Sequence, residues 1–177
     1  MIEDPEAELW FGDEVHFQLH TTTTRMWAFK GRQPEIASKP GREKVGFVGA
    51  VLPATGELFV GIACKFNTTT FVSFLRCLLA ARKGSGKRIW LVLDNASWHK
   101  RASRQLAEEN PDRFGVIFLP PYSPDLNPIE RLWRLTRRIC THNKYFDCLD
   151  DLAATVLGFF EAHALPNDTL RHLCAIN

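Results

Sequence analysis

The sequence predicts an α/β fold in which a central mixed sheet is flanked by helices. In the second half of the chain, short apolar runs bounded by turn residues alternate with segments of helical periodicity, which is typical of parallel strands joined by crossover helices. In the first half, an alternating segment and a hairpin predict that the leading part of the sheet is antiparallel. The chain has 177 residues, a normal size for one compact domain, so we expect residues 1–177 to form a single unit.

The first half of the chain is expected to supply the leading strands. Strands are expected at residues 8–18, 25–30, 45–52 and 57–63. Apolar residues alternate along the first of these, which indicates a half-buried strand. They are Leu9, Phe11, Val15 and Phe17. The last two strands are joined by Pro53-Ala54-Thr55-Gly56, whose turn-forming residues predict a hairpin.

The second half is expected to alternate helices with buried strands. Strands are expected at residues 89–93 and 116–119, and helices at 67–83, 99–109, 128–141, 150–163 and 168–173. Asn67 can cap the first helix and Gly84-Ser85-Gly86 can end it. Asn110-Pro111 ends the second helix, and a proline-rich loop at 120–128 precedes the third.

Composition excludes several classes of protein. No apolar run approaches the roughly 18 residues that cross a bilayer, and Met1 to Glu8 carries four acids and no base, unlike a signal peptide. We therefore expect no membrane partner and a cytoplasmic, nucleoid-associated location. The five cysteines show no C-x-x-C spacing, so they are interpreted as reduced, mostly buried thiols and not as a zinc site.

Basic residues gather in two acid-free stretches, although the net charge is only +2. Residues 58–93 contain Lys65, Arg76, Arg82, Lys83, Lys87 and Arg88, and residues 131–146 contain Arg131, Arg134, Arg137, Arg138 and Lys144. Such stretches suit a phosphate backbone. The alternative is a solvated helix face that balances acids elsewhere in the fold.

Two aspartates occupy unusual positions on expected strands. Asp13 lies on the apolar face of its strand, where a charge is costly unless a partner or a metal compensates it; Glu14 points the other way and is the weaker candidate. The alternative for Asp13 is a strand end or bulge that faces solvent. Asp94 follows a buried strand, where α/β sheets form ligand sites. The alternative is that Asp94-Asn95 simply opens a turn.

Glu130 stands at the start of the third expected helix. It could face the carboxyl end of the sheet, because it lies at the edge of the helix side that packs. Two structural roles compete with this. Asn127 as N-cap, Pro128 at the first helical position and Glu130 would make a capping box, and Glu130 could also pair with Arg134 one turn later.

Three carboxylates from distant parts of the chain suit metal-dependent phosphodiester chemistry. Two Mg²⁺ ions about 3.5–4 Å apart can serve the attacking and leaving oxygens of an in-line displacement, and Mg²⁺ prefers carboxylate ligands. Histidine and cysteine do not cluster, which argues against zinc. The sequence contains no P-loop, G-x-G-x-x-G or G-x-S-x-G motif, so nucleotide-binding and serine-hydrolase interpretations lack support.

Three motifs resemble those of mariner-like transposases and their bacterial insertion-sequence relatives. Residues 119–130, LPPYSPDLNPIE, with Trp133 after them, look like the third catalytic motif. Residues 91–99, LVLDNASWH, are similar to the second, and Gly12-Asp13-Glu14 followed by WAFKG at 27–31 resembles the first. The likeness extends over about residues 8–145.

The resemblance implies a ribonuclease-H-like fold with a central mixed five-stranded sheet, two Mg²⁺ or Mn²⁺ ions, and cut-and-paste DNA transposition. Asp13, Asp94 and Glu130 would be both the catalytic residues and the metal ligands. Hydrolysis at each transposon end would free a 3′-OH that attacks double-stranded target DNA, usually at a TA step. A homodimer on DNA is expected, because two ends must be joined.

Weaker roles follow for the neighbours of these acids. Asn95 and His99 would orient Asp94 or contact DNA. Tyr122, Pro124 and Asn127 would shape the loop that aims Glu130. Trp98 would either hold DNA or be buried under its loop, and bases such as Arg131 and Arg134 would hold DNA strands.

Members of this family carry a helix-turn-helix region that recognises transposon ends, and no such region is recognisable here. We expect it to be encoded in a separate upstream frame that is joined by frameshifting, or to be missing through truncation, and this domain alone to bind DNA mainly through phosphates. Two other functions remain open. One is a different nuclease of the same fold, and the other is a catalytically inactive DNA-binding remnant of a transposon.

Overall fold

Strand β1 (Ala7–Gln18) lies at the centre of a mixed sheet. The structure is a computed structural model that describes residues 6–176; the acidic start, Met1 to Pro5, and Asn177 lie outside it. Within that range the sheet has five strands in the order β3-β2-β1-β4-β5. The other strands are β2 (Lys44–Leu52), β3 (Glu57–Ile62), β4 (Arg88–Leu93) and β5 (Phe114–Phe118). The expected α/β sheet of five strands is confirmed.

The direction of the strands changes at β1. Strands β1, β2 and β3 pair antiparallel, whereas β1, β4 and β5 pair parallel. The antiparallel half is a strand and a tight hairpin, and the parallel half needs a crossover helix between its strands, as the pattern of the sequence predicts. The carboxyl ends of β4 and β5 therefore lie at one edge of the sheet, next to the middle of β1.

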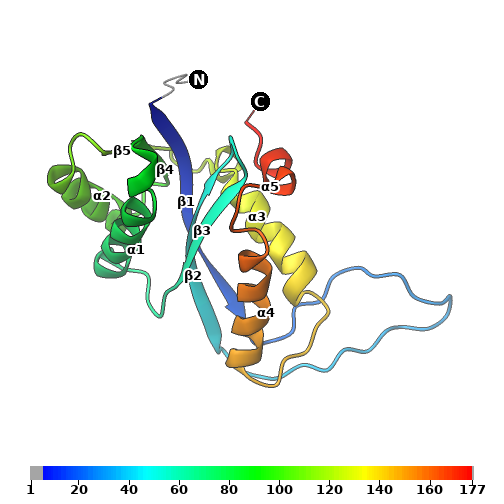
Figure 1. Cartoon of the computed structure of the whole chain (residues 1–177). Coiled ribbons are helices and arrows are strands. Elements are labelled where there is room, and N and C mark those ends of the chain that lie inside the picture. The colour runs from blue at the N-terminus through cyan, green and yellow to red at the C-terminus, as the bar shows by residue number, and fades with distance from the viewer. Residues whose placement is uncertain (1–5, 177) are drawn as a thin grey trace.

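Helices cover both faces of the sheet (Figure 1). Helices α1 (Thr68–Ala81) and α2 (Ser97–Glu109) pack on one face. Helices α3 (Ile129–Thr136), α4 (Leu149–Glu161) and α5 (Asp168–Leu173) pack on the other. Short helical turns also occur at η1 (Lys83–Ser85), η2 (Pro124–Leu126) and the π-helical η3 (Arg137–Thr141), which continues α3. No helix among residues 6–176 is long and apolar enough to span a bilayer.

The alternation along β1 separates two cores. Phe11, Val15 and Phe17 face the core under α3 and α4, as predicted, but Trp10 is buried in the opposite core under α1. The expectation of a half-buried strand is therefore wrong. Both faces of β1 are covered because a central strand of an α/β sheet has helices on either side.

The segment at residues 19–43 is not a strand, which corrects the expectation for residues 25–30. It projects from the sheet between β1 and β2 (Figure 1). Trp27 and Phe29 are exposed on it. Its base is tied down, since Thr21 donates to the carbonyl of Ala37 at 2.9 Å and Lys39 to that of Asp147 at 2.8 Å. The segment cannot join the sheet beside β1, because β2 and β4 already occupy both edges of that strand.

Most other boundaries agree with the sequence pattern to within two residues. The Asn67 side chain caps α1 by accepting from the Thr70 N–H at 2.9 Å, as predicted. All five cysteines are free, but Cys64, Cys77 and Cys148 are exposed, so the expectation of mostly buried thiols is wrong. The spacing of cysteines along the sequence predicts whether they pair but does not predict how far each side chain is buried.

Trp133 of α3 lies against β2 at Gly49, where a side chain would not fit. A Cβ added to Gly49 would lie 2.7 Å from Cη2 of Trp133 and 3.2 Å from Cγ2 of Val60. Contacts this short force neighbouring groups to move. The absence of a side chain at Gly49 therefore sets how closely α3 approaches the sheet.

Gly49→Ala is expected to destabilise the fold. Overpacking of this kind costs about 1–3 kcal/mol, and each kcal/mol lowers the Tm of a domain of this size by about 2–4 °C. Thermal denaturation followed by circular dichroism measures the change. Gly158→Ala is the control, because a Cβ there meets nothing within 4 Å and alanine favours the α4 helix. Equal effects of the two substitutions would contradict this packing.

Candidate active site

The parallel register of β1 and β4 brings two of the predicted acids together. Phe11 of β1 is level with Val92 of β4. Asp13 and Asp94 each follow this pair by two residues, so they lie side by side at the carboxyl end of β4. Gly12 allows this approach, since a Cβ there would lie 3.0 Å from Cδ2 of Leu93. A turn role for Asp94 is also present, because its Oδ1 accepts from the Ala96 N–H at 3.0 Å.

The loop before α3 brings Glu130 to the same place. Asn127 is buried and its side-chain amide donates to the carbonyl of Gly12 at 3.1 Å, which fastens the loop to β1 beside Asp13. The alternative of a capping box is therefore wrong, since the Asn127 side chain bonds to β1 and provides no cap for α3. The alternative pairing of Glu130 with Arg134 is not among the ion pairs of residues 6–176 either.

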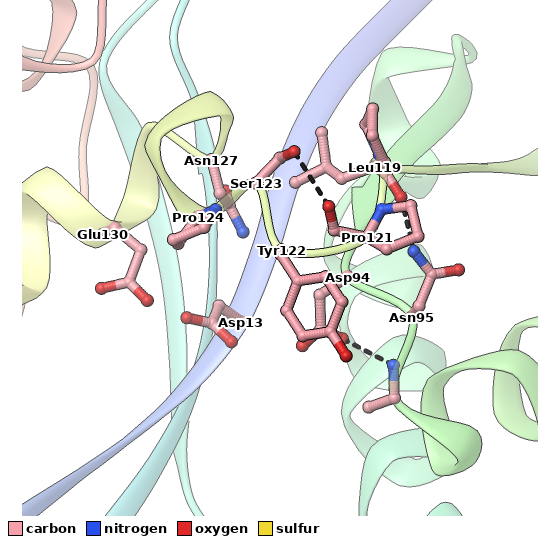
Figure 2. Close-up of a pocket in the computed structure, with 12 residues that line it drawn as sticks. Asp13, Asp94, Asn95, Leu119, Pro121, Tyr122, Ser123, Pro124, Asn127 and Glu130 are labelled. Carbon is pink, nitrogen blue, oxygen red and sulfur yellow. Dashed lines mark hydrogen bonds between the residues drawn. The ribbon is translucent and has the colours of Figure 1, made fainter.

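The three acids line one pocket of about 430 Å³. Figure 2 shows Asp13 between Glu130 and Asp94, with the proline-rich loop along one side. The other predicted residues that line it are Asn95, Tyr122, Pro124 and Asn127. His99, Arg131 and Arg134 do not line it. The structure thus gathers side chains from β1, the end of β4 and the start of α3.

Asp13 carries the strongest electrostatic perturbation in the pocket. Burial raises its pKa from 3.8 to about 7, and the negative charges of Glu130, Glu14 and Asp94 act in the same direction, against a backbone hydrogen bond at Glu14 that lowers it. The indole N–H of Trp133 donates to Asp13 Oδ2 at 3.3 Å. The position is therefore costly for a carboxylate, as the sequence predicts, and a cation would relieve the cost.

Asp94 has the opposite environment because His99 lies beside it. His99 Nδ1 lies 2.5 Å from Asp94 Oδ1, and this hydrogen bond lowers the pKa of Asp94 although burial opposes it. Burial alone would lower the pKa of His99, but its hydrogen bonds to Asp94 and Glu14 raise it to about 9. His99 is fully buried, so of its two expected roles the structure favours orienting Asp94 over contact with DNA.

Two loop residues have clear structural roles. The Asn95 amide donates to the carbonyl of Leu119 at 2.5 Å and so links the loop after β4 to the one after β5. Tyr122 is fully exposed at the pocket and has a φ of 57°, an uncommon conformation for a residue other than glycine. The proline-rich loop is thus held at Asn95 and Asn127 and presents Tyr122 to solvent.

Several bases of the two acid-free stretches are engaged within the fold. Arg76 pairs with Glu109, and Arg82 pairs with Glu8 and Glu57, which is the alternative of balancing acids elsewhere. Arg131 donates to the carbonyls of Leu173 and Ala175 and so holds the C-terminal segment. Arginines that are engaged in these contacts are less available to bind DNA phosphates.

Two features of the site were not predicted from the sequence. Trp98 is half-buried and donates to Glu14, and Glu14 also contacts His99, although it was the weaker carboxylate candidate. Helix α2 exposes Lys100, Arg101 and Arg104. These bases lie in a third and shorter acid-free stretch, residues 95–107, between Asp94 and Glu108. Their spacing on one helix is the signal that could have found them.

The chemistry of the pocket fits a divalent cation of the Mg²⁺ type. Its charged side chains offer hard carboxylate oxygens, and Asp13 bears a penalty that a cation would remove. Among residues 6–176, however, no three His, Cys, Asp or Glu side chains stand as a ready-made metal cage. Mg²⁺ does not need one, since it commonly keeps several waters and takes oxygens from bound phosphate.

Comparison with known proteins gives consistent results. A family model described as DDE superfamily endonuclease matches residues 8–153. The insertion element IS630 uncharacterized 39 kDa protein of Shigella sonnei is 31% identical over 157 residues, 88% of this chain and 45% of that protein. Uncharacterized protein y4pE/y4sA of Sinorhizobium fredii is 31% identical over 104 residues, 59% of this chain and 73% of that protein.

Solved structures confirm the ribonuclease-H-like fold. The Mos1 transposase paired-end complex with left transposon end has a TM-score of 0.72 at 17% identity and covers 94% of this chain and 51% of the Mos1 chain. The Mos1 strand transfer complex has a TM-score of 0.68 at 18% identity, over 94% of this chain and 50% of that one. The chain therefore spans about half the length of the Shigella and Mos1 chains that it matches.

Asp13→Asn is expected to raise the Tm of the protein in a chelator at pH 8. The raised pKa of Asp13 means that the folded state loses stability as the pH rises from about 4 through about 7, and asparagine removes this loss. The gain should shrink toward zero at pH 4. It is measured by thermal denaturation of both proteins across this pH range.

Asp94→Asn is the matched comparison and should lower the Tm. Its pKa is lowered by His99, so ionised Asp94 stabilises the fold above its ordinary pKa, and an amide loses that charge-assisted hydrogen bond. Changes of the same sign at the two aspartates would contradict the electrostatic description of the pocket.

Proposed function

This chain belongs to the DDE superfamily endonucleases, and from that premise we propose that it is the catalytic domain of a DNA transposase of the insertion-sequence type. The observation that carries the proposal is the convergence of Asp13, Asp94 and Glu130 on one pocket at the carboxyl edge of the sheet. These three side chains are the proposed catalytic residues. They come from distant parts of the chain, and a purely structural role does not explain their meeting.

The proposed cofactor is Mg²⁺ or Mn²⁺, held as two ions by the three carboxylates. When bound, such ions activate an attacking oxygen and stabilise the leaving oxygen of a phosphodiester. Asp13, central and partly buried, would be shared between the ions, and Asp94 and Glu130 would each complete one side. Mos1 paired-end complexes with Mn and with Mg support the choice of metals.

The proposed reaction consists of two phosphoryl transfers in the same pocket. Hydrolysis at a transposon end would free a 3′-OH, and that hydroxyl would then attack double-stranded target DNA, with TA as the expected target step. The pocket's residues would hold the scissile phosphate while the attacking group changes from water to a 3′-OH. The Mos1 strand transfer complex supports the second step.

Two alternative functions are separated by simple assays. A nuclease of the same fold would cut DNA without joining a 3′-OH to a target, whereas an inactive remnant would do neither. Retention of all three acids in one pocket favours activity. An assay with pre-cut ends and a supercoiled target tests joining directly.

DNA would lie across the pocket and the exposed face of α2. Ala96, which precedes α2, lines the pocket, and Lys100, Arg101 and Arg104 are exposed further along the same helix. These bases can neutralise phosphates on a strand whose cleavage site enters the pocket. Such contacts position DNA and do not read its sequence.

Recognition of transposon ends would need further parts. We propose that a helix-turn-helix unit, in the same chain or encoded separately, reads the ends, and that two copies of the domain act together on DNA. The paired-end complexes of Mos1 support the pairing of ends. The bacterial nucleoid would be the place of action.

Asp13→Ala, Asp94→Ala and Glu130→Ala are each expected to abolish divalent-metal-dependent nicking of supercoiled DNA. Loss of a metal ligand removes several kcal/mol of transition-state stabilisation, which is a fall in rate of roughly 1,000-fold or more. Gel assays with Mg²⁺, Mn²⁺ and a chelator measure the activity, and circular dichroism shows whether the fold survives.

Asp112→Ala is the control for these substitutions, because Asp112 is exposed in the turn before β5 and does not line the pocket. It should nick at the wild-type rate. If one of the three pocket variants nicks at that rate, the role assigned to its residue is wrong.

Combined replacement of Arg101 and Arg104 by alanine is expected to weaken DNA binding equally for all sequences. Each lost phosphate contact reduces the slope of log K against log salt by about 0.9 in duplex DNA, so the slope should fall by about 1.8. Fluorescence anisotropy over a salt series measures it. Arg76→Ala is the control, since Arg76 is paired with Glu109, and should leave the slope unchanged.

A further inference from the structure

We propose that Glu14 is a positioning residue that fixes Asp94 through His99, so that Asp94 presents its second oxygen to a divalent cation. This inference rests on the proposed function of the pocket and assigns a role to a carboxylate that lies outside it. Glu14 follows Asp13 in β1 and so points to the opposite side of the strand. It reaches the pocket only by way of the histidine.

The hydrogen bonds form a continuous chain across the sheet edge. Glu14 Oε2 lies 2.8 Å from His99 Nε2, and His99 Nδ1 lies 2.5 Å from Asp94 Oδ1. Both ring nitrogens therefore face a carboxylate. The imidazole cannot satisfy both contacts after a ring flip or a change of rotamer, so it links the two acids rigidly.

Glu14 is itself held at both oxygens. Its second oxygen, Oε1, accepts from the indole N–H of Trp98 at 2.9 Å. The side chain of Glu14 is 7% exposed and that of His99 is 0% exposed. Burying these groups costs free energy unless each is paired, and here each is. Phe71 packs on the His99 ring, with centroids 4.3 Å apart, and closes it off from water.

Asp94 is the exposed end of this chain of hydrogen bonds, and its orientation depends on them. Its side chain is 57% exposed, and such a carboxylate would sample several orientations. Within residues 6–176, the hydrogen bonds to the Asp94 carboxylate come from His99 and from the Ala96 N–H, and both end on Oδ1. Oδ2 is left for a ligand in the pocket. Partners of this kind behind a ligand commonly set its orientation and metal affinity.

A second buried acid on β1 provides a matched comparison. Glu8 lies on the same side of β1 as Glu14, is buried, and pairs with Arg82. It does not line the pocket. Its replacement should therefore cost stability without altering the geometry of Asp94, whereas replacement of Glu14 should alter both.

The test compares Mn²⁺ binding to Glu14→Gln, Glu8→Gln and the wild type in the absence of DNA. Glutamine keeps the size of Glu14 but leaves one oxygen to serve two donors, so Mn²⁺ affinity measured by calorimetry should fall about 10- to 100-fold. Glu8→Gln should keep wild-type affinity. In nicking assays, Glu14→Gln should need about 10- to 100-fold more Mg²⁺ for half-maximal rate, with the rate largely restored at saturation.

Each outcome decides between the two proposals. Wild-type Mn²⁺ affinity in Glu14→Gln would overturn the positioning role and leave the proposed function intact. Absence of Mn²⁺ binding that depends on Asp94 in the wild type would overturn both. If Glu14→Gln does not fold, Trp98→Phe takes its place. It removes only the N–H that holds Oε1 and should weaken Mn²⁺ binding several-fold, and an unchanged affinity would overturn the role.

Discussion

The cost of keeping a buried carboxylate among other carboxylates is the constraint on which the site depends. Burial contributes most to the raised pKa of Asp13, and the negative charges of Glu130, Glu14 and Asp94 add to it. Hydrogen bonds from neighbouring groups nevertheless hold the acids in place. Trp133 donates to Asp13, His99 to Asp94, and Asn127 fastens the loop that leads to Glu130. The free energy of folding that is lost by burying Asp13 would be recovered when a divalent cation binds in the pocket.

The sheet provides the rigidity that such an arrangement needs. Asp13 is part of the central strand, where it lies opposite Gly49 of β2 and two residues beyond the last pair with β4, so the sheet restricts its backbone. Asp94 follows the end of β4 and is held there by His99, and Glu130 lies in the first turn of α3. The tight approach of Trp133 to Gly49 extends this rigidity to α3.

Local sequence patterns predicted the elements well because strand alternation, caps and glycine breaks are local signals. Asn67 caps α1 as its position implies, yet Asn127, with a similar pattern around it, does not cap α3. The difference is a tertiary hydrogen bond to Gly12, which no local pattern contains. The strand expected at 25–30 could not pair beside β1, the strand that precedes it, because β2 and β4 occupy both edges of β1.

The three acids of the pocket were predicted from the sequence, but the residues that hold them in place were predicted only in part. Asp13, Asp94 and Glu130 stand out because a charge on an apolar face or at a strand end is visible in the sequence. Glu14 does not stand out, because its partner His99 lies 85 positions away and on the far side of the strand. The sequence also does not show which basic residues are free to bind DNA. Arg82 lies in a basic stretch but is used by two acids, whereas Arg101 is exposed.

The order of synthesis makes α3 the element that completes the pocket. Asp13 and Asp94 leave the ribosome first, and Asn127, Glu130 and Trp133 emerge later, so an unfinished chain lacks both the third acid and the groups that steady the first. A polypeptide that ends before α3 would therefore lack a complete three-acid pocket. The pocket would be completed late in synthesis, together with the core that α3 and α4 form on the sheet.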